Sequence, residues 1–111
     1  MQGHKVILTW EAIYDVTDIA EYIEAEFGQD RADRFQLDID KQLEHLEYVG
    51  TMLGKTDLLY RGYPIYKKVF SPSIIFYIVK ESEKEIHVLR VLREERDWEK
   101  VMTLRQEYEY P

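Results

Sequence analysis

Two long stretches with helical spacing, joined by a very short link, constrain the fold of this chain more than any other feature. Residues 11–27 place apolar side chains on one face at every third or fourth position, and acids fill the opposite face. Gly28 is typical of a helix end, and Asp30 is suited to cap a second helix that ends at Gly50. Because the link is so short, we expect the two helices to form an antiparallel hairpin.

Segments rich in β-branched and aromatic residues flank this hairpin, and each predicts a strand. They are residues 5–10, 65–70, 74–80 and 86–93. Short links join the last three, so these strands are expected to be antiparallel neighbours. Residues 50–64 are rich in glycine and proline and predict turns, and residues 94–108 predict a short helix. The predicted fold class is α+β: an N-terminal strand, the helical hairpin, then a three-stranded antiparallel meander, with one twisted sheet packed on the helices.

Length and charge set the outer limits of function. The 111 residues predict a single domain over residues 1–111, and the absence of cysteine excludes disulfides and thiolate metal sites. The net charge is -7, and residues 11–47 hold twelve acids against three bases. This asymmetry predicts one acidic face and a less acidic working face, and it argues against tight non-specific binding of nucleic acid. No apolar run approaches the roughly 20 residues of a membrane span, so we expect a cytoplasmic protein that does not contact a membrane.

Two motifs, taken with the order of the elements, resemble the RelE/ParE superfamily of toxins from type II toxin–antitoxin modules. The first is "YKKVFSPSIIFYIV", which looks like the family's basic residue followed by two strands, and the second is "IHVLRVLREERDW", which looks like its last strand and exit. The resemblance covers roughly residues 5–102. It implies a cognate antitoxin as partner, a role in plasmid stabilisation, and no cofactor.

The resemblance also implies one of two activities. RelE-like members cut messenger RNA in the ribosome, whereas ParE-like members inhibit DNA gyrase. Our leading interpretation of the sequence is a RelE-like, metal-independent endoribonuclease that acts on ribosome-bound mRNA. The alternatives are a ParE-like gyrase inhibitor that cleaves nothing, and a degenerate toxin that only binds its antitoxin.

Metal-free RNA cleavage requires groups that move protons and that stabilise a negatively charged phosphorane. We expect Lys67, Arg90 and Arg93 to supply this chemistry, because arginine forks bind phosphate oxygens in pairs. Alternation along the strands predicts that Lys67 and Arg90 point to the sheet face away from the hairpin, with Arg90 next to Tyr77. Substrate or partner binding is assigned to a supporting set: Arg61, Lys68, Tyr77 and Arg96.

Structural roles compete with each of these assignments. Arg90 is as well suited to a salt bridge with one of the many acids, and Lys67 and Lys68 to keeping an edge strand from aggregating. Arg96 and Asp97 suit the cap of the last segment. The three histidines share no metal-ligand spacing, so no metal site is expected. Four tyrosines cluster near the proposed working region, namely Tyr60, Tyr63, Tyr66 and Tyr77.

Overall fold

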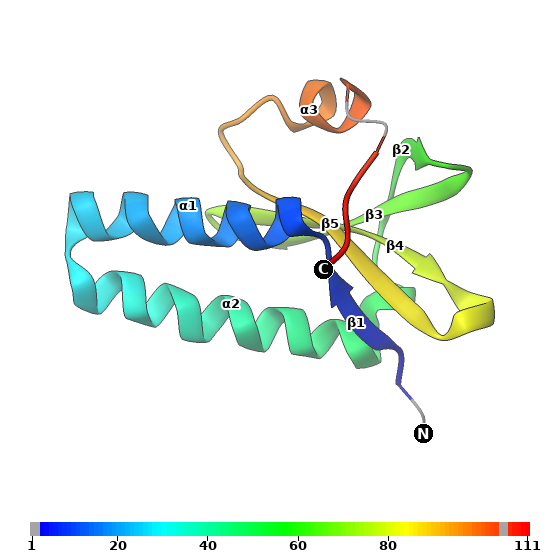
Figure 1. The fold of residues 1–111 in the computed structure, drawn as a ribbon, viewed down its shortest axis with the longest axis horizontal. Helices are drawn as coiled ribbons and strands as arrows, with labels where there is room; N and C mark the ends of the chain where they lie inside the picture. Colours follow the sequence, from blue (N-terminus) through cyan, green and yellow to red (C-terminus); the bar gives the residue numbers. More distant parts are fainter. Residues whose placement is uncertain (1–2, 105–106) are drawn as a thin grey trace.

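A computed structural model describes residues 3–104 and 107–111. In this part of the chain a helical hairpin packs against a five-stranded sheet in the order β1-β5-β4-β3-β2 (Figure 1). The elements are β1 (Lys5–Leu8), α1 (Trp10–Phe27), α2 (Gln29–Val49), β2 (Lys55–Tyr60), β3 (Tyr63–Phe70), β4 (Ser73–Lys80), β5 (Glu85–Arg93) and α3 (Trp98–Leu104).

The helical hairpin forms as the periodicity predicts, with small differences at its ends. Thr9 caps α1, because its hydroxyl accepts a hydrogen bond of 3.0 Å from the Ala12 amide. The first strand therefore stops at Leu8 and does not reach residue 10. Gly28 has a φ of 98° and reverses the chain between the helices, so α2 begins at Gln29 and Asp30 lies in its first turn rather than at the cap.

The predicted α+β class and the β3-β4-β5 meander are present, but the sheet is larger and mixed. β1 pairs with β5 in parallel, with Val6 opposite Ile86. The segment predicted as turns contains β2, which pairs antiparallel with β3 at the other edge. Glycines and a proline bracket this strand in the sequence, and they masked its alternation of exposed and covered side chains.

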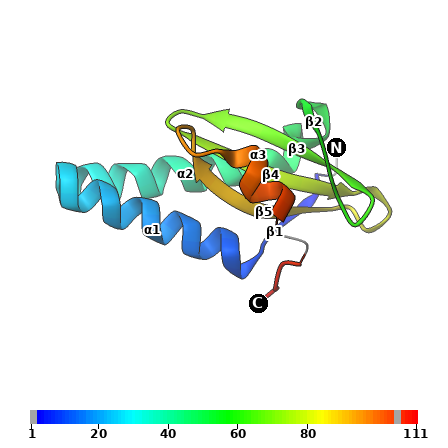
Figure 2. The same cartoon turned by 90° about the horizontal axis from the view of Figure 1, so that it is seen from above.

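The sheet is covered on both faces by separate apolar clusters. We call the side packed on α1 and α2 the helix face; it includes Ile75, Tyr77, Ile86, Val88 and Val91. The second face carries Ile74, Phe76, Ile78, Leu89 and Leu92, and residues from α3 and the C-terminal segment cover it. Figure 2 shows α3 over this second face, with the hairpin on the other side of the sheet. The central strands are therefore buried on both sides.

The segment after β5 contains the predicted short helix. A helix was expected within residues 94–108, and α3 covers only Trp98–Leu104 of it. Asp97 caps that helix with its side chain, which accepts a hydrogen bond of 3.3 Å from the Lys100 amide. Residues 107–111 are not helical, and they run back toward the start of α1 (Figure 1). Residues 105–106 lie outside the described part.

The turn between β2 and β3 depends on a glycine. Arg61 and Gly62 both have positive φ angles, 50° and 87°. Such a two-residue turn matches the twist of the strands that it joins. Added at Gly62, a Cβ atom would meet no neighbour within 4 Å, so backbone conformation alone sets the cost of replacing it.

We expect Gly62→Ala to lower the free energy of unfolding by about 1 kcal/mol, because a left-handed conformation is costly for a residue with a Cβ atom. Urea denaturation measures this change. Gly54→Ala is the matched control, since its Cβ atom also meets nothing within 4 Å and its φ is not in the left-handed range. Equal stability of the two variants would contradict the turn geometry.

Candidate functional site

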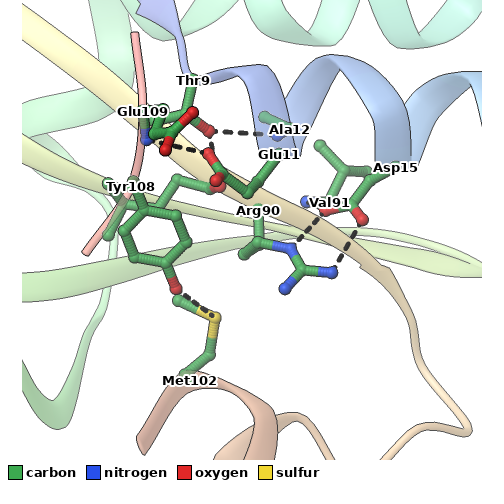
Figure 3. A network of polar contacts seen from close by, with 10 residues as sticks. Thr9, Glu11, Ala12, Asp15, Arg90, Val91, Met102, Tyr108 and Glu109 are labelled. Carbon is green, nitrogen blue, oxygen red and sulfur yellow. Dashed lines mark hydrogen bonds and ion pairs between the residues drawn. The ribbon is translucent and has the colours of Figure 1, made fainter. Parts of the chain in front are cut away.

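Arg90 is held in an ion pair with a helix residue. Its Nε and Nη2 donate hydrogen bonds of 2.7 and 2.8 Å to the two carboxylate oxygens of Asp15 on α1 (Figure 3). Both side chains are largely covered, with exposed fractions of 16% and 10%. Of the two roles weighed for Arg90, the structure therefore shows the salt bridge. Arg90 does project from the second face as expected, because it lies opposite Phe76, but its guanidinium is not a free cation.

Asp15 also continues the sheet where β1 stops. β1 supports β5 as far as the pair of Leu8 with Val88. Beyond that point, the Thr9 hydroxyl donates to the Leu89 carbonyl at 2.8 Å, and Asp15 Oδ2 accepts from the Val91 amide at 2.9 Å. Side chains of α1 and its cap thus satisfy backbone groups that would otherwise be buried without partners.

A bulge in β5 interrupts the alternation of its side chains directly before Arg90. Phe76 faces Arg90 and Tyr77 faces Val88, so Leu89 is an extra residue in the β4-β5 ladder. The extra residue shifts the alternation along the strand. Strict alternation would place Leu89 on the same face as Val91. Val91 packs on the helix face, but Leu89 packs on the second face.

The charge of Arg90 is stabilised by its surroundings. The hydrogen bonds that Arg90 donates to Asp15 raise the pKa of Arg90, and burial opposes this rise. This guanidinium stays protonated, and two of its N–H donors are already bonded to a carboxylate. In this structure Asp15 therefore occupies the two-pronged contact that a phosphate would use.

Tyr77 is a core residue of the helix face. Its side chain is fully buried, its ring stacks on Tyr66 at 5.3 Å, and its hydroxyl donates a hydrogen bond of 2.7 Å to the Gly50 carbonyl. Burial raises the pKa of Tyr77 well above its usual value, and the nearby Tyr66 adds to the rise. The expected exposure of Tyr77 beside Arg90 was wrong. No ligand can reach this hydroxyl without opening the core.

Lys67 points to the second face, as the alternation predicted. It lies opposite Phe76, and its ammonium group is 5.0 Å from the centre of the Trp98 ring on α3. A shallow pocket of about 230 Å³ surrounds it, and Asp57 and Glu99 contribute acids to the lining. Lys68 lies opposite Ile75 and therefore belongs to the helix face. The two lysines are separated by the sheet.

Arg93 and Arg96 lie on the α1 side of the molecule. The guanidinium of Arg93 is 4.1 Å from the centre of the Tyr22 ring and forms an ion pair with Glu95. Both arginines line a pocket of about 200 Å³ between α1 and the end of β5, where Asp15 and Asp18 also contribute. The acids balance the arginines, so this pocket has no strong preference for an anion.

Arg61 lies far from these residues, in the β2-β3 turn. Its guanidinium is 5.5 Å from the Tyr60 ring centre and 3.4 Å from a carboxylate oxygen of Glu107. The expected cluster of four tyrosines is divided by the sheet. Tyr66 and Tyr77 lie on the helix face, while Tyr60 and Tyr63 join Tyr108 and Tyr110 in a pocket on the second face.

The three proposed catalytic residues are therefore not brought together. Lys67 lies on the α3 side of the sheet, Arg93 lies on the α1 side, and Arg90 is bonded to Asp15. Sequence reasoning missed Asp15, which is one of many acids on an acidic helix and carries no local signal of its role. Within the described residues no group of three or more potential ligands is placed to hold a metal ion. No helix in that part of the chain is long and apolar enough to cross a membrane.

Comparison with known proteins places this fold in a family. The sequence profile described as the ParE toxin of the type II toxin–antitoxin system parDE matches residues 6–98. The chain belongs to the ParE toxin family. It is a type II toxin of the wider RelE/ParE superfamily, as the two sequence motifs predicted. A comparison with curated protein sequences found no match.

Solved structures share the fold of this ParE family member. The chromosomal ParDE system from P. aeruginosa contains a chain that is 23% identical, with a TM-score of 0.68 over 81% of this chain and 95% of that one. The RelBE2 toxin–antitoxin complex from Mycobacterium tuberculosis contains one that is 16% identical, with a TM-score of 0.59 over 86% and 97%. The matched profile ends at residue 98, so nearly all of α3 and the whole C-terminal segment lie beyond it.

We expect Arg90→Met to lower the free energy of unfolding by about 3 kcal/mol, because it leaves the covered Asp15 carboxylate without its cation. Urea denaturation gives the value. Arg90→Lys should recover only part of the loss, since an ammonium cannot replace the two-pronged contact.

Arg93→Met is the control for this prediction, because Arg93 is more exposed and should cost less than about 1 kcal/mol. Adding Asp15→Asn to each variant completes a double-mutant cycle, which should give a coupling energy above about 1 kcal/mol for the Arg90 pair. Additive effects of Asp15→Asn and Arg90→Met would disprove a direct link.

Proposed function

We propose that this ParE family member is a toxin that inhibits DNA gyrase by binding it, and that it cleaves no RNA. One observation carries the proposal: Lys67 and Arg93, two of the three residues expected to perform cleavage, lie on opposite faces of the sheet. Lys67 contacts Trp98 on one side, while Arg93 contacts Tyr22 on the other. General acid–base catalysis needs its groups within hydrogen-bond reach of one reacting phosphate, which this arrangement prevents.

The charge distribution favours the same choice. Acids lie beside the two pockets that hold the proposed catalytic cations. A nuclease of structured or ribosome-bound RNA gains its affinity mainly from cations that face phosphates. The balanced charge here, on a chain with a net charge of -7, fits a protein surface better than an RNA backbone.

Induced expression should therefore arrest growth while cellular mRNA stays intact in primer extension, and the purified protein should inhibit DNA supercoiling by gyrase. Heat-denatured protein is the control in the supercoiling assay. Codon-phased mRNA cuts that disappear in a Lys67→Gln/Arg93→Gln variant would select the nuclease instead. Absence of toxicity, with no effect on supercoiling, would contradict both activities and indicate a degenerate toxin.

The proposal includes a cognate antitoxin, encoded beside the toxin, in a cytoplasmic module that stabilises a plasmid or chromosomal region. Both similar structures come from toxin–antitoxin systems. A partner segment over the second face would have to share it with α3 and residues 107–111. The outer edge of β2 offers unpaired backbone groups and the exposed Leu59, so it favours an antitoxin strand that extends the sheet.

Leu59→Lys should weaken binding of the co-purified antitoxin by about tenfold or more, because it places a desolvated charge in the contact. Isothermal titration calorimetry measures the affinity. Leu37→Lys is a matched control: Leu37 is 62% exposed, against 64% for Leu59, but it lies on α2. A larger loss for Leu37→Lys would place the antitoxin on the hairpin.

A further inference from the structure

A pocket on the second face gathers aromatic side chains from distant parts of the sequence. Its volume is about 210 Å³, and Ile78 of β4 lines it together with side chains of the β2-β3 hairpin and the C-terminal segment. We call it the tyrosine pocket after its aromatic residues, Tyr60, Tyr63, Tyr108 and Tyr110. It is separate from the pockets that hold Lys67 and Arg93.

Hydrogen bonds hold the aromatic walls of this pocket in place. Tyr60 and Tyr108 meet edge to face at 5.1 Å, and the Tyr60 hydroxyl accepts a hydrogen bond of 3.1 Å from the Tyr108 amide. The Tyr110 hydroxyl is 2.7 Å from Nδ1 of His87, whose Nε2 is 3.0 Å from Glu85. Burial raises the pKa of Tyr110 to about 12, so its hydroxyl is neutral at physiological pH. Walls that are ordered in advance lose little entropy when a ligand binds.

Two cations stand beside the aromatic walls. The guanidinium of Arg61 is 5.5 Å from the Tyr60 ring centre, and the Lys80 ammonium is 5.4 Å from the Tyr63 ring centre. The carboxylate of Glu107 contacts Arg61 at 3.4 Å, but the two side chains are 60% and 83% exposed. Exposed pairs of this kind contribute little energy, so an incoming anion can replace the carboxylate.

These features define the ligand as a planar aromatic group that carries an anion. We propose that the tyrosine pocket binds a nucleoside monophosphate. The base lies against the tyrosine walls over Ile78, as bases stack on aromatic side chains in single-strand binding proteins. The phosphate pairs with Arg61 and Lys80 through charge-assisted hydrogen bonds.

The size of the pocket selects a mononucleotide over a larger cofactor. Pockets for drug-sized ligands occupy roughly 300–1,000 Å³, and this one is below that range. One ring system fills it, while the ribose and phosphate extend toward the two cations at its side. The site adds a small-molecule function to the proposed gyrase inhibitor. It does not depend on gyrase inhibition, because none of the residues used to argue that activity line the tyrosine pocket.

The experiment titrates the purified chain with AMP, GMP, CMP and UMP and follows the tyrosine signals by NMR. At least one monophosphate should bind about tenfold more tightly than both its nucleoside and inorganic phosphate, because only the monophosphate uses both parts of the site. If the nucleoside and the monophosphate bound equally well, Arg61 and Lys80 would contribute nothing to binding, which would contradict the proposed phosphate contacts. If inorganic phosphate bound as tightly as the monophosphate, the tyrosines would contribute nothing, which would contradict the proposed base contacts. If no monophosphate bound, the proposal would be overturned.

Variants then test the assigned residues. Lys80→Gln should weaken monophosphate binding about fivefold or more and leave nucleoside binding unchanged, since it removes one phosphate contact. Tyr63→Leu should weaken binding of the nucleoside and the monophosphate alike, because it removes a stacking surface. Lys41→Gln on α2 is the control for lost positive charge and should bind as the wild type does. If Lys41→Gln lost as much monophosphate affinity as Lys80→Gln, the effect would come from net charge alone, and this would contradict the site.

Discussion

The bond between Asp15 and β5 joins the two halves of this structure. β1 supplies hydrogen bonds to β5 only as far as Val88, and the chain then turns into α1 at the Thr9 cap. From α1, Asp15 accepts a hydrogen bond from the Val91 amide and pairs with Arg90 through both carboxylate oxygens. One carboxylate thus continues the hydrogen bonding of β5 beyond β1, joins the hairpin to the sheet, and neutralises Arg90.

Coverage of the second face decides what this sheet can do. α3 places Trp98 on Phe76. Two hydrogen bonds join the C-terminal segment to the start of α1: the Trp10 amide donates to the Glu109 carbonyl at 2.8 Å, and the Glu109 amide donates to the Glu11 carboxylate at 3.1 Å. These additions lie mostly beyond the part of the chain that matches the ParE profile. They convert a sheet with one free face into one that is buried on both sides, and they leave pockets at its margins in place of an open platform.

Sequence patterns were reliable where one periodicity governed a whole element. The spacing of apolar residues predicts the hairpin and the meander, and alternation along β3 predicts that Lys67 lies on the second face. Each of these patterns depends only on side chains a few residues apart. β2 was missed because its bracketing glycines and proline resemble a loop, and only pairing with β3 makes it a strand. Strict alternation fails at Leu89 for another reason: this extra residue in β5 shifts the pattern, and no local sequence signal predicts it.

The sequence by itself determined the family, the acidic hairpin and the set of residues able to carry chemistry, since motifs and helical spacing are local properties. Only the tertiary structure decided which of those residues meet. It paired Arg90 with Asp15, placed Lys67 and Arg93 on opposite sides of the sheet, and brought Tyr108 to Tyr60 across 48 positions of the chain. Contacts of that range depend on strand register, bulges and the path of the C-terminal segment, which are set by the packing of the whole domain.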